Sequence, residues 1–161
     1  MRETPGRGAT NTWLTPPSII RSLGEFDLDP ACPPDMPWRT ARVMFTEDDN
    51  GLMQPWEGRV WLNPPYGKEA DNWLDRLALH GNGIALTFVR SETGSFFRNV
   101  WNKADAIFFF RGRLSFCTID GNTAGTSAAP SCLIAYGAHN ADAIAKSRLK
   151  GKLIRLREEA A

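Results

Sequence analysis

Short apolar runs alternate along this chain with polar, turn-forming stretches, and each such run predicts a buried strand. Six runs qualify, at residues 26–29, 42–46, 59–63, 84–89, 105–110 and 131–136. Between them, apolar positions with helical spacing occur near 16–23, 69–79 and 95–102. The second of these stretches places Ala70, Trp73, Leu74 and Leu77 on one face, which predicts an amphipathic helix.

The order of these elements indicates an α/β fold. Strands that alternate with helices are typical of a mostly parallel sheet covered by helices on both faces, that is, a three-layer sandwich. No helix-like stretch separates the last two strands, so we expect the final strand to run antiparallel to its neighbour. Residues 117–130 are rich in Gly, Thr, Ser and Ala, and they are expected to form a mobile loop.

The chain is long enough for one domain with a sizeable core, since it has 161 residues of which 42% are hydrophobic. We expect a single domain over 1–161, with 1–11 and 141–161 flexible or peripheral. No stretch approaches the roughly 20 apolar residues of a membrane span, and residues 1–11 lack the apolar core of a signal peptide. The expected location is therefore the cytoplasm.

The cysteines predict neither a disulfide framework nor a metal site. Cys32, Cys117 and Cys132 are odd in number and widely spaced, without a Cys-x-x-Cys pair. Only His80 and His139 could assist them as metal ligands. Free thiols in a reducing compartment, with no bound metal, are the simplest interpretation.

The net charge of +1 does not by itself indicate a nucleic-acid-binding protein. The charge is unevenly distributed, however, because residues 141–161 hold six basic and three acidic side chains. The six basic residues are Lys146, Arg148, Lys150, Lys152, Arg155 and Arg157, and no acid lies between them. This segment could contact phosphates, or it could be a solvated tail or an exposed helix face.

The tetrapeptide Asn63-Pro64-Pro65-Tyr66 follows the apolar run Val60-Trp61-Leu62 and carries the clearest chemistry. The Asn63 side-chain oxygen and the Pro64 carbonyl can accept hydrogen bonds from the two N–H groups of a planar amine, and the prolines hold both acceptors in place. An aromatic face such as that of Tyr66 stacks on a base, worth roughly 1–3 kcal/mol. These features suit methyl transfer to the exocyclic nitrogen of adenine, while the alternative is a rigid turn.

Acidic and basic side chains occur where other predicted strands end. Asp29 follows one strand, and Glu47, Asp48 and Asp49 follow the next. In open α/β sheets, the carboxyl ends of strands bind nucleotide-like ligands. A Pro-containing turn and a solvated acidic loop are the structural alternatives. Three arginines, Arg90, Arg111 and Arg113, also follow apolar runs, so we expect them near the mouth of the same site.

Several motifs in sequence order resemble one known family. They are Trp13-x-Thr15-Pro16, the segment 26–31 (Phe-Asp-Leu-Asp-Pro-Ala), Asp49-x-Gly51-Leu52 followed by Trp56, and the segment 61–67 (Trp-Leu-Asn-Pro-Pro-Tyr-Gly). This set resembles the phage-type DNA adenine-N6 methyltransferases, the phage Dam family. The resemblance continues into 112–116 and 130–134 and covers roughly residues 11–137.

The resemblance implies a class I, Rossmann-like methyltransferase fold, S-adenosylmethionine as cofactor, double-stranded DNA as substrate and a phage or prophage origin. By position, Thr15 and Pro16 match the element near the methionine end of the cofactor. Asp29, Pro30 and Ala31 match the first cofactor motif, with Asp29 near the methionine amino group or the turn that holds it. Asp48 or Asp49 matches the acid near the adenosine, and Asn63, Pro64, Pro65 and Tyr66 match the catalytic motif. One departure is that Asp29 is followed by Pro-Ala-Cys-Pro-Pro rather than by a glycine-rich turn.

Two other functions stay open from the sequence. Methyltransferases that act on protein glutamine or on RNA amines share Asn-Pro-Pro-Tyr, although they usually carry a glycine-rich first motif. A nucleic-acid-binding relic of the fold that has lost turnover is the other option, and the intact tetrapeptide argues against it. For a DNA enzyme, Arg90, Arg111 and Arg113 are the expected DNA-binding residues.

Overall fold

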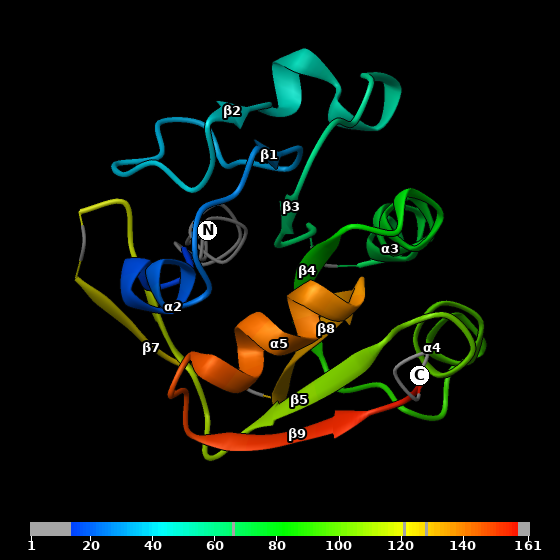
Figure 1. The fold of residues 1–161 in the computed structure, drawn as a ribbon. Helices are drawn as coiled ribbons and strands as arrows, with labels where there is room; N and C mark the ends of the chain where they lie inside the picture. The colour runs from blue at the N-terminus through cyan, green and yellow to red at the C-terminus, as the bar shows by residue number, and fades with distance from the viewer. Residues whose placement is uncertain (1–13, 66, 121, 128, 158–161) are drawn as a thin grey trace, which may run out of the picture.

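The computed structural model describes residues 14–65, 67–120, 122–127 and 129–157. Within them, seven strands form one sheet in the order β2-β1-β3-β4-β8-β5-β9 (Figure 1). The strands are β1 (Leu28–Asp29), β2 (Val43–Met44), β3 (Val60–Leu62), β4 (Gly83–Phe88), β5 (Ala106–Phe110), β8 (Ser131–Tyr136) and β9 (Gly151–Arg155). All six expected strands are present.

Strand direction divides the sheet into two parts. β2, β1, β3 and β4 pair in parallel, whereas β8 is antiparallel to both β4 and β5. β5 therefore runs in the same direction as β4, and β9 pairs antiparallel with β5 at the sheet edge. The sheet is mostly parallel by strand direction, as predicted, but it contains two antiparallel strands in the described residues rather than one.

Helices pack on both faces of the sheet because side chains alternate along each strand. One buried cluster joins α2 (Pro17–Ser22) and α5 (Ala138–Lys146) to strand residues such as Trp61 and Leu133. The other joins α3 (Ala70–His80) and the segment formed by α4 (Gly94–Phe96) and η3 (Phe97–Trp101) to strand residues such as Leu62 and Ile134. Figure 1 shows α5 lying over β8 and β5. No helix in the described residues is long and apolar enough to cross a membrane.

Two expected elements differ from the sequence interpretation. The helix expected near 95–102 is a short α4 (Gly94–Phe96) that continues as a π-helical segment, η3 (Phe97–Trp101). The segment 117–130 is not simply a loop, because β6 (Ser115–Cys117) and β7 (Thr123–Thr126) form a two-stranded antiparallel sheet. Small, weakly apolar residues in β7 gave no strand pattern from which this hairpin could be predicted.

The segment expected to be flexible or peripheral, 141–161, has an ordered place in its described part. It contributes most of α5 and all of β9, which lies at the edge of the sheet. Gly151 makes this pairing possible, because a Cβ at that position would lie 2.1 Å from the Phe109 carbonyl oxygen. The segment is thus peripheral in position, but 151–155 is a strand rather than a loose tail or an exposed helix face.

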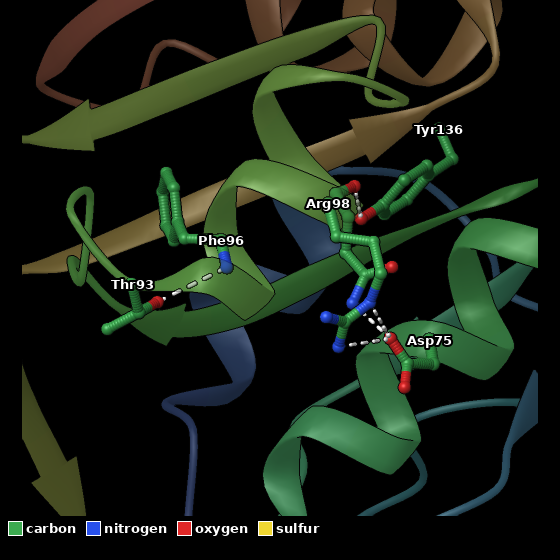
Figure 2. A network of polar contacts seen from close by, with 6 residues as sticks. Asp75, Thr93, Phe96, Arg98 and Tyr136 are labelled. Atoms are coloured by element: carbon green, nitrogen blue, oxygen red, sulfur yellow. Dashed lines mark hydrogen bonds and ion pairs between the residues drawn. The ribbon is translucent and has the colours of Figure 1, made fainter.

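A polar network fixes the π-helical segment against its neighbours (Figure 2). Asp75 of α3 accepts hydrogen bonds from Arg98, at 3.3 Å from Nε and 3.2 Å from Nη2, and from the Asn99 side chain. The hydroxyl of Tyr136 on β8 donates to the Asn99 carbonyl oxygen at 2.6 Å. The Thr93 hydroxyl accepts from the Phe96 N–H at 3.2 Å and caps α4. Figure 2 therefore shows α3, the α4–η3 segment and β8 held as one unit.

Candidate active site

Asn63 lies directly after β3, at the edge of the sheet where the parallel strands β1, β2, β3 and β4 end. Its Nδ2 atom donates to the Thr15 hydroxyl at 3.1 Å, and Thr15 is almost completely buried. This bond engages the nitrogen side of the amide, and the Asn63 Oδ1 atom has no hydrogen-bond partner among the described residues, so it is available as an acceptor. Thr15, expected near the cofactor, therefore orients the amide of Asn63, the residue expected to be catalytic.

Two cavities adjoin the prolines that follow Asn63. Pro64 is buried and lines both of them, while Pro65 is exposed and lines only the first. Tyr66, the fourth residue of the motif, lies outside the described residues. A rigid proline between two cavities suits a reaction in which two ligands meet, because its fixed φ holds the shared wall in place.

The first cavity, of about 520 Å³, opens at the ends of β1, β2 and β3. Its walls are the turn after β1, the loop that contains η1 (Glu47–Asp49) and η2 (Gly51–Met53), the residues after β3 and the start of α3. The polar lining residues include Glu47, Asn50, Asn63, Glu69 and Asn72. In addition, the Nε1 atom of Trp73 is buried without a hydrogen-bond partner among the described residues. This volume and lining suit a small molecule with several polar groups.

Asp29 does not line this cavity but supports its wall from beneath. The carboxylate is buried and accepts from the Thr40 hydroxyl at 2.5 Å and from the Ala31 N–H at 3.2 Å. Burial raises the pKa of Asp29 to about 6, against the lowering effect of these two hydrogen bonds. The Asp29 carboxylate thus holds the turn after β1 in place. Pro30 and Ala31, which it holds, do line the cavity.

Pro16, expected with Thr15 near the methionine end of the cofactor, is the residue before α2 and lines neither of the two cavities. The acidic run after β2 divides its side chains between two tasks. Asp49 accepts from the Thr46 N–H at 2.9 Å and from the Thr46 hydroxyl at 3.3 Å, so it caps η1. Neither Asp48 nor Asp49 lines the cavity, whereas Glu47 does. The structure thus shifts the candidate for an acidic ligand contact from the two predicted aspartates to Glu47.

The second cavity, of about 440 Å³, lies between the starts of α3 and α4 and the end of β4. Apolar walls come from Leu74, Phe88 and Phe96, and Arg90 also lines it. The Ser95 hydroxyl in its lining is buried without a partner among the described residues. Arg90 therefore lies where the sequence placed it, beside the candidate catalytic motif.

Arg111 and Arg113 follow β5 at the same edge of the sheet, but they line neither of the two cavities. Both are exposed to solvent. Sequence reasoning missed the lining residues Asn50, Glu69, Asn72 and Ser95. Glu69 and Asn72 belong to the turn and helix that directly follow Asn-Pro-Pro-Tyr-Gly. Their closeness to this motif in the sequence could have indicated that they line the site. For Ser95 the sequence carried no signal, because the cavity forms only when α4 packs beside α3.

The chain was compared with known proteins. A family model described as DNA N-6-adenine-methyltransferase (Dam) matches residues 4–144. No curated protein and no solved structure matches the chain.

The close approach of Gly51 to the turn after β1 gives a first prediction. A Cβ at this position would lie 1.9 Å from the Pro30 carbonyl oxygen, so Gly51→Ala forces the two walls of the first cavity apart. We expect a loss of about 1–3 kcal/mol in the free energy of unfolding, measured by urea denaturation. The matched control is Gly94→Ala, because a Cβ at Gly94 meets no atom within 4 Å. Equal stability of the two variants would contradict the assigned packing.

The buried Asp29 carboxyl predicts a pH-dependent stability. Its pKa is about 6 in the folded protein and 3.8 as its ordinary value, so between about pH 4 and pH 6 the folded state retains a proton that the unfolded chain has released. Raising the pH through this window therefore destabilises the parent relative to Asp29→Asn, by up to about 3 kcal/mol. Denaturation of both proteins at pH 4 and pH 7 measures the change. A difference that is independent of pH would show that the carboxyl is not buried in this way.

Proposed function

The chain belongs to the DNA N-6-adenine-methyltransferase (Dam) family, and from this premise we propose that it transfers a methyl group from S-adenosylmethionine to N6 of adenine in double-stranded DNA. The observation that carries the proposal is that Pro64 lines both cavities and directly follows Asn63, which lines the first. One cavity has the size and polarity for the cofactor, and the other can receive a base. We further propose a single-domain, three-layer, class I Rossmann-like methyltransferase encoded by a phage or prophage.

The first cavity fits the cofactor by the chemistry of its lining. The Trp73 Nε1–H is a buried donor that needs an acceptor, and a nucleoside or a carboxylate supplies one. Glu47 follows Asp29 by about the spacing at which an acid in dinucleotide-binding folds accepts from ribose hydroxyls. Glu69 and Asn72 add acceptors suited to an ammonium group. Pro30 and Ala31 form the wall opposite, held from below by Asp29.

When bound, S-adenosylmethionine supplies an electrophilic methyl group on a positively charged sulfur. The residues of this chain prepare the nucleophile. The Asn63 Oδ1 atom and the Pro64 carbonyl oxygen accept hydrogen bonds from the two N–H groups of the adenine amine. These bonds favour a directed lone pair on N6. Both acceptors also stabilise the positive charge that develops on N6 before its proton is released to solvent.

The second cavity gives the target base a place outside the duplex. A flipped adenine costs a few kcal/mol of unstacking, which the enclosing walls offset. Phe88 and Phe96 provide apolar surface, and the Ser95 hydroxyl provides an unused hydrogen-bonding group. Tyr66 is proposed to stack on the base. Arg90, Arg111 and Arg113 are proposed DNA contacts at the same sheet edge.

The function is tested by expressing the chain in a host that lacks its own adenine methylation. The host DNA is digested to nucleosides and analysed by mass spectrometry, in parallel with host RNA and protein. We expect N6-methyladenine in the DNA of cells with the parent chain and far less in cells with Asn63→Ala. Methyl groups found only in RNA or protein would redirect the substrate, and no methyl transfer to any fraction would contradict the proposed activity.

Asn63→Ala also has a specific kinetic expectation. Loss of one preorganised acceptor should lower turnover about a hundredfold or more, by analogy with the removal of a single oxyanion-hole donor. The affinity for S-adenosylmethionine, measured by calorimetry, should change little. The matched control is Asn72→Ala, which removes the same group from the first cavity while Asn63 stays intact. This control should weaken cofactor binding more than turnover, and the reverse pattern would contradict the assignment of the two asparagines.

A further inference from the structure

The C-terminal basic segment joins the active-site edge of the sheet through main-chain pairing. β9 pairs with β5 from Gly151 opposite Phe110 to Arg155 opposite Ala106. Just beyond this ladder, the Arg111 N–H donates to the Lys150 carbonyl oxygen at 2.9 Å. The turn between α5 and β9 therefore lies at the carboxyl end of β5. Asn63 and Arg90 lie at the same edge, because β3, β4 and β5 run in one direction.

Four cations lie on the two segments that this hydrogen bond joins, two on the segment after β5 and two on the turn before β9. They are Arg111, Arg113, Arg148 and Lys150, and all four are exposed. Their side chains make no hydrogen bond or ion pair among the residues that the structure describes. No acidic residue occurs in the segments 106–119 and 143–157 that supply them. We call these four residues the corner cluster.

The turn that carries Arg148 and Lys150 is fixed by its own contacts. Leu149 packs against the hydrophobic cluster beneath α2 and α5, and its N–H donates to the Ser147 hydroxyl at 3.3 Å. Arg148, with φ of 62°, adopts the left-handed conformation that the tight turn requires. An anchored leucine between two exposed cations holds their charges at a defined place, unlike the charges of a mobile tail.

Two other basic residues of the segment bind partners within the protein. Arg155 pairs with Asp142 at 2.8 Å, and Arg157 donates to the Asn102 carbonyl oxygen at 2.7 Å. Both lie toward the amino end of β5, away from Asn63. Arg155 and Arg157 thus have protein partners, whereas Arg148 and Lys150 at the active-site edge have none among the described residues.

We propose that the corner cluster binds the phosphate backbone of DNA and that Arg148 and Lys150 belong to this surface together with Arg111 and Arg113. The inference rests on the proposed function, because it assigns the face on which the substrate duplex lies. Cations without a partner among the described residues, on two joined segments that contain no acid, complement a polyphosphate. Such contacts position a duplex without reading its sequence. The surface should therefore contribute equally to binding of any duplex.

The test compares two double variants that remove the same charges from opposite edges of the sheet. Arg148→Gln with Lys150→Gln removes half of the corner cluster. Arg21→Gln with Lys103→Gln is the control, since both residues are exposed and lie at the opposite edge of the sheet, where the parallel strands begin. We call this the amino edge. Arg21 lies near the end of α2, and the carbonyl oxygen of the nearby Leu23 accepts a hydrogen bond from Arg59, the residue before β3. Lys103 precedes β5. Binding of a short fluorescent duplex is measured by anisotropy over a range of salt concentrations, with two unrelated sequences.

We expect the corner variant to lower the slope of log affinity against log salt concentration by about 2, since each lost phosphate contact contributes about 0.9. Its affinity at moderate salt should fall on the order of tenfold for both duplexes, and its affinity for S-adenosylmethionine should not change. The control should match the parent. A corner variant with the parent's slope, or a control that loses as much, would overturn the inference. Its failure is distinct from failure of the proposed function, which is judged by N6-methyladenine in DNA exposed to the parent chain.

Discussion

The hydrogen bond between Asn63 and Thr15 is the contact on which the active-site geometry depends. It selects which end of the Asn63 amide is available as an acceptor. Thr15 is itself held because its neighbour Leu14 pairs with Cys117 of β6 through two main-chain hydrogen bonds, of 2.9 and 2.8 Å. The orientation of one amide near the middle of the chain is thus set by residues before α2 and by the β6–β7 hairpin. Contacts far apart in sequence converge on a single side chain.

The two edges of the sheet are built for different purposes. At the amino edge, Arg59 donates to the carbonyl oxygens of Leu23 and Glu25 and to the Asn140 side chain, and its guanidinium lies 4.2 Å from the centre of the Phe26 ring. These bonds join residues before β1, before β3 and within α5. The carboxyl edge has cavities and exposed charges instead. The amino edge thus joins several elements through Arg59, while polar groups at the carboxyl edge line cavities that can receive ligands.

Much of the sheet followed from the sequence because β4, β5 and β8 are continuous apolar runs, whose burial on both faces leaves a strong pattern. β9 has no such apolar pattern, since its exposed position at the edge of the sheet permits Lys152 and Arg155 within the strand. The candidate catalytic motif could be proposed from the sequence because its residue types suit the chemistry. The role of Asp29 could not, because it depends on Thr40, which is brought close only by the fold. The choice among Glu47, Asp48 and Asp49 depends on side-chain directions within one helical turn, which composition does not encode.

The order of the strands explains how a chain with a net charge of only +1 can serve the proposed cationic cofactor and the proposed polyanionic substrate. β2 and β1 lie on one side of β3, and Glu47 and Asp29 are at their ends. β5 and β9 lie on the other side, and the corner cluster is at their junction. Asn63 and Pro64 sit between these regions of opposite charge. The acidic side favours a sulfonium and an ammonium, the basic side favours phosphates, and their effects largely cancel at a distance. Net charge therefore conceals a separation of charge along one sheet edge, with the proposed methyl transfer at its centre.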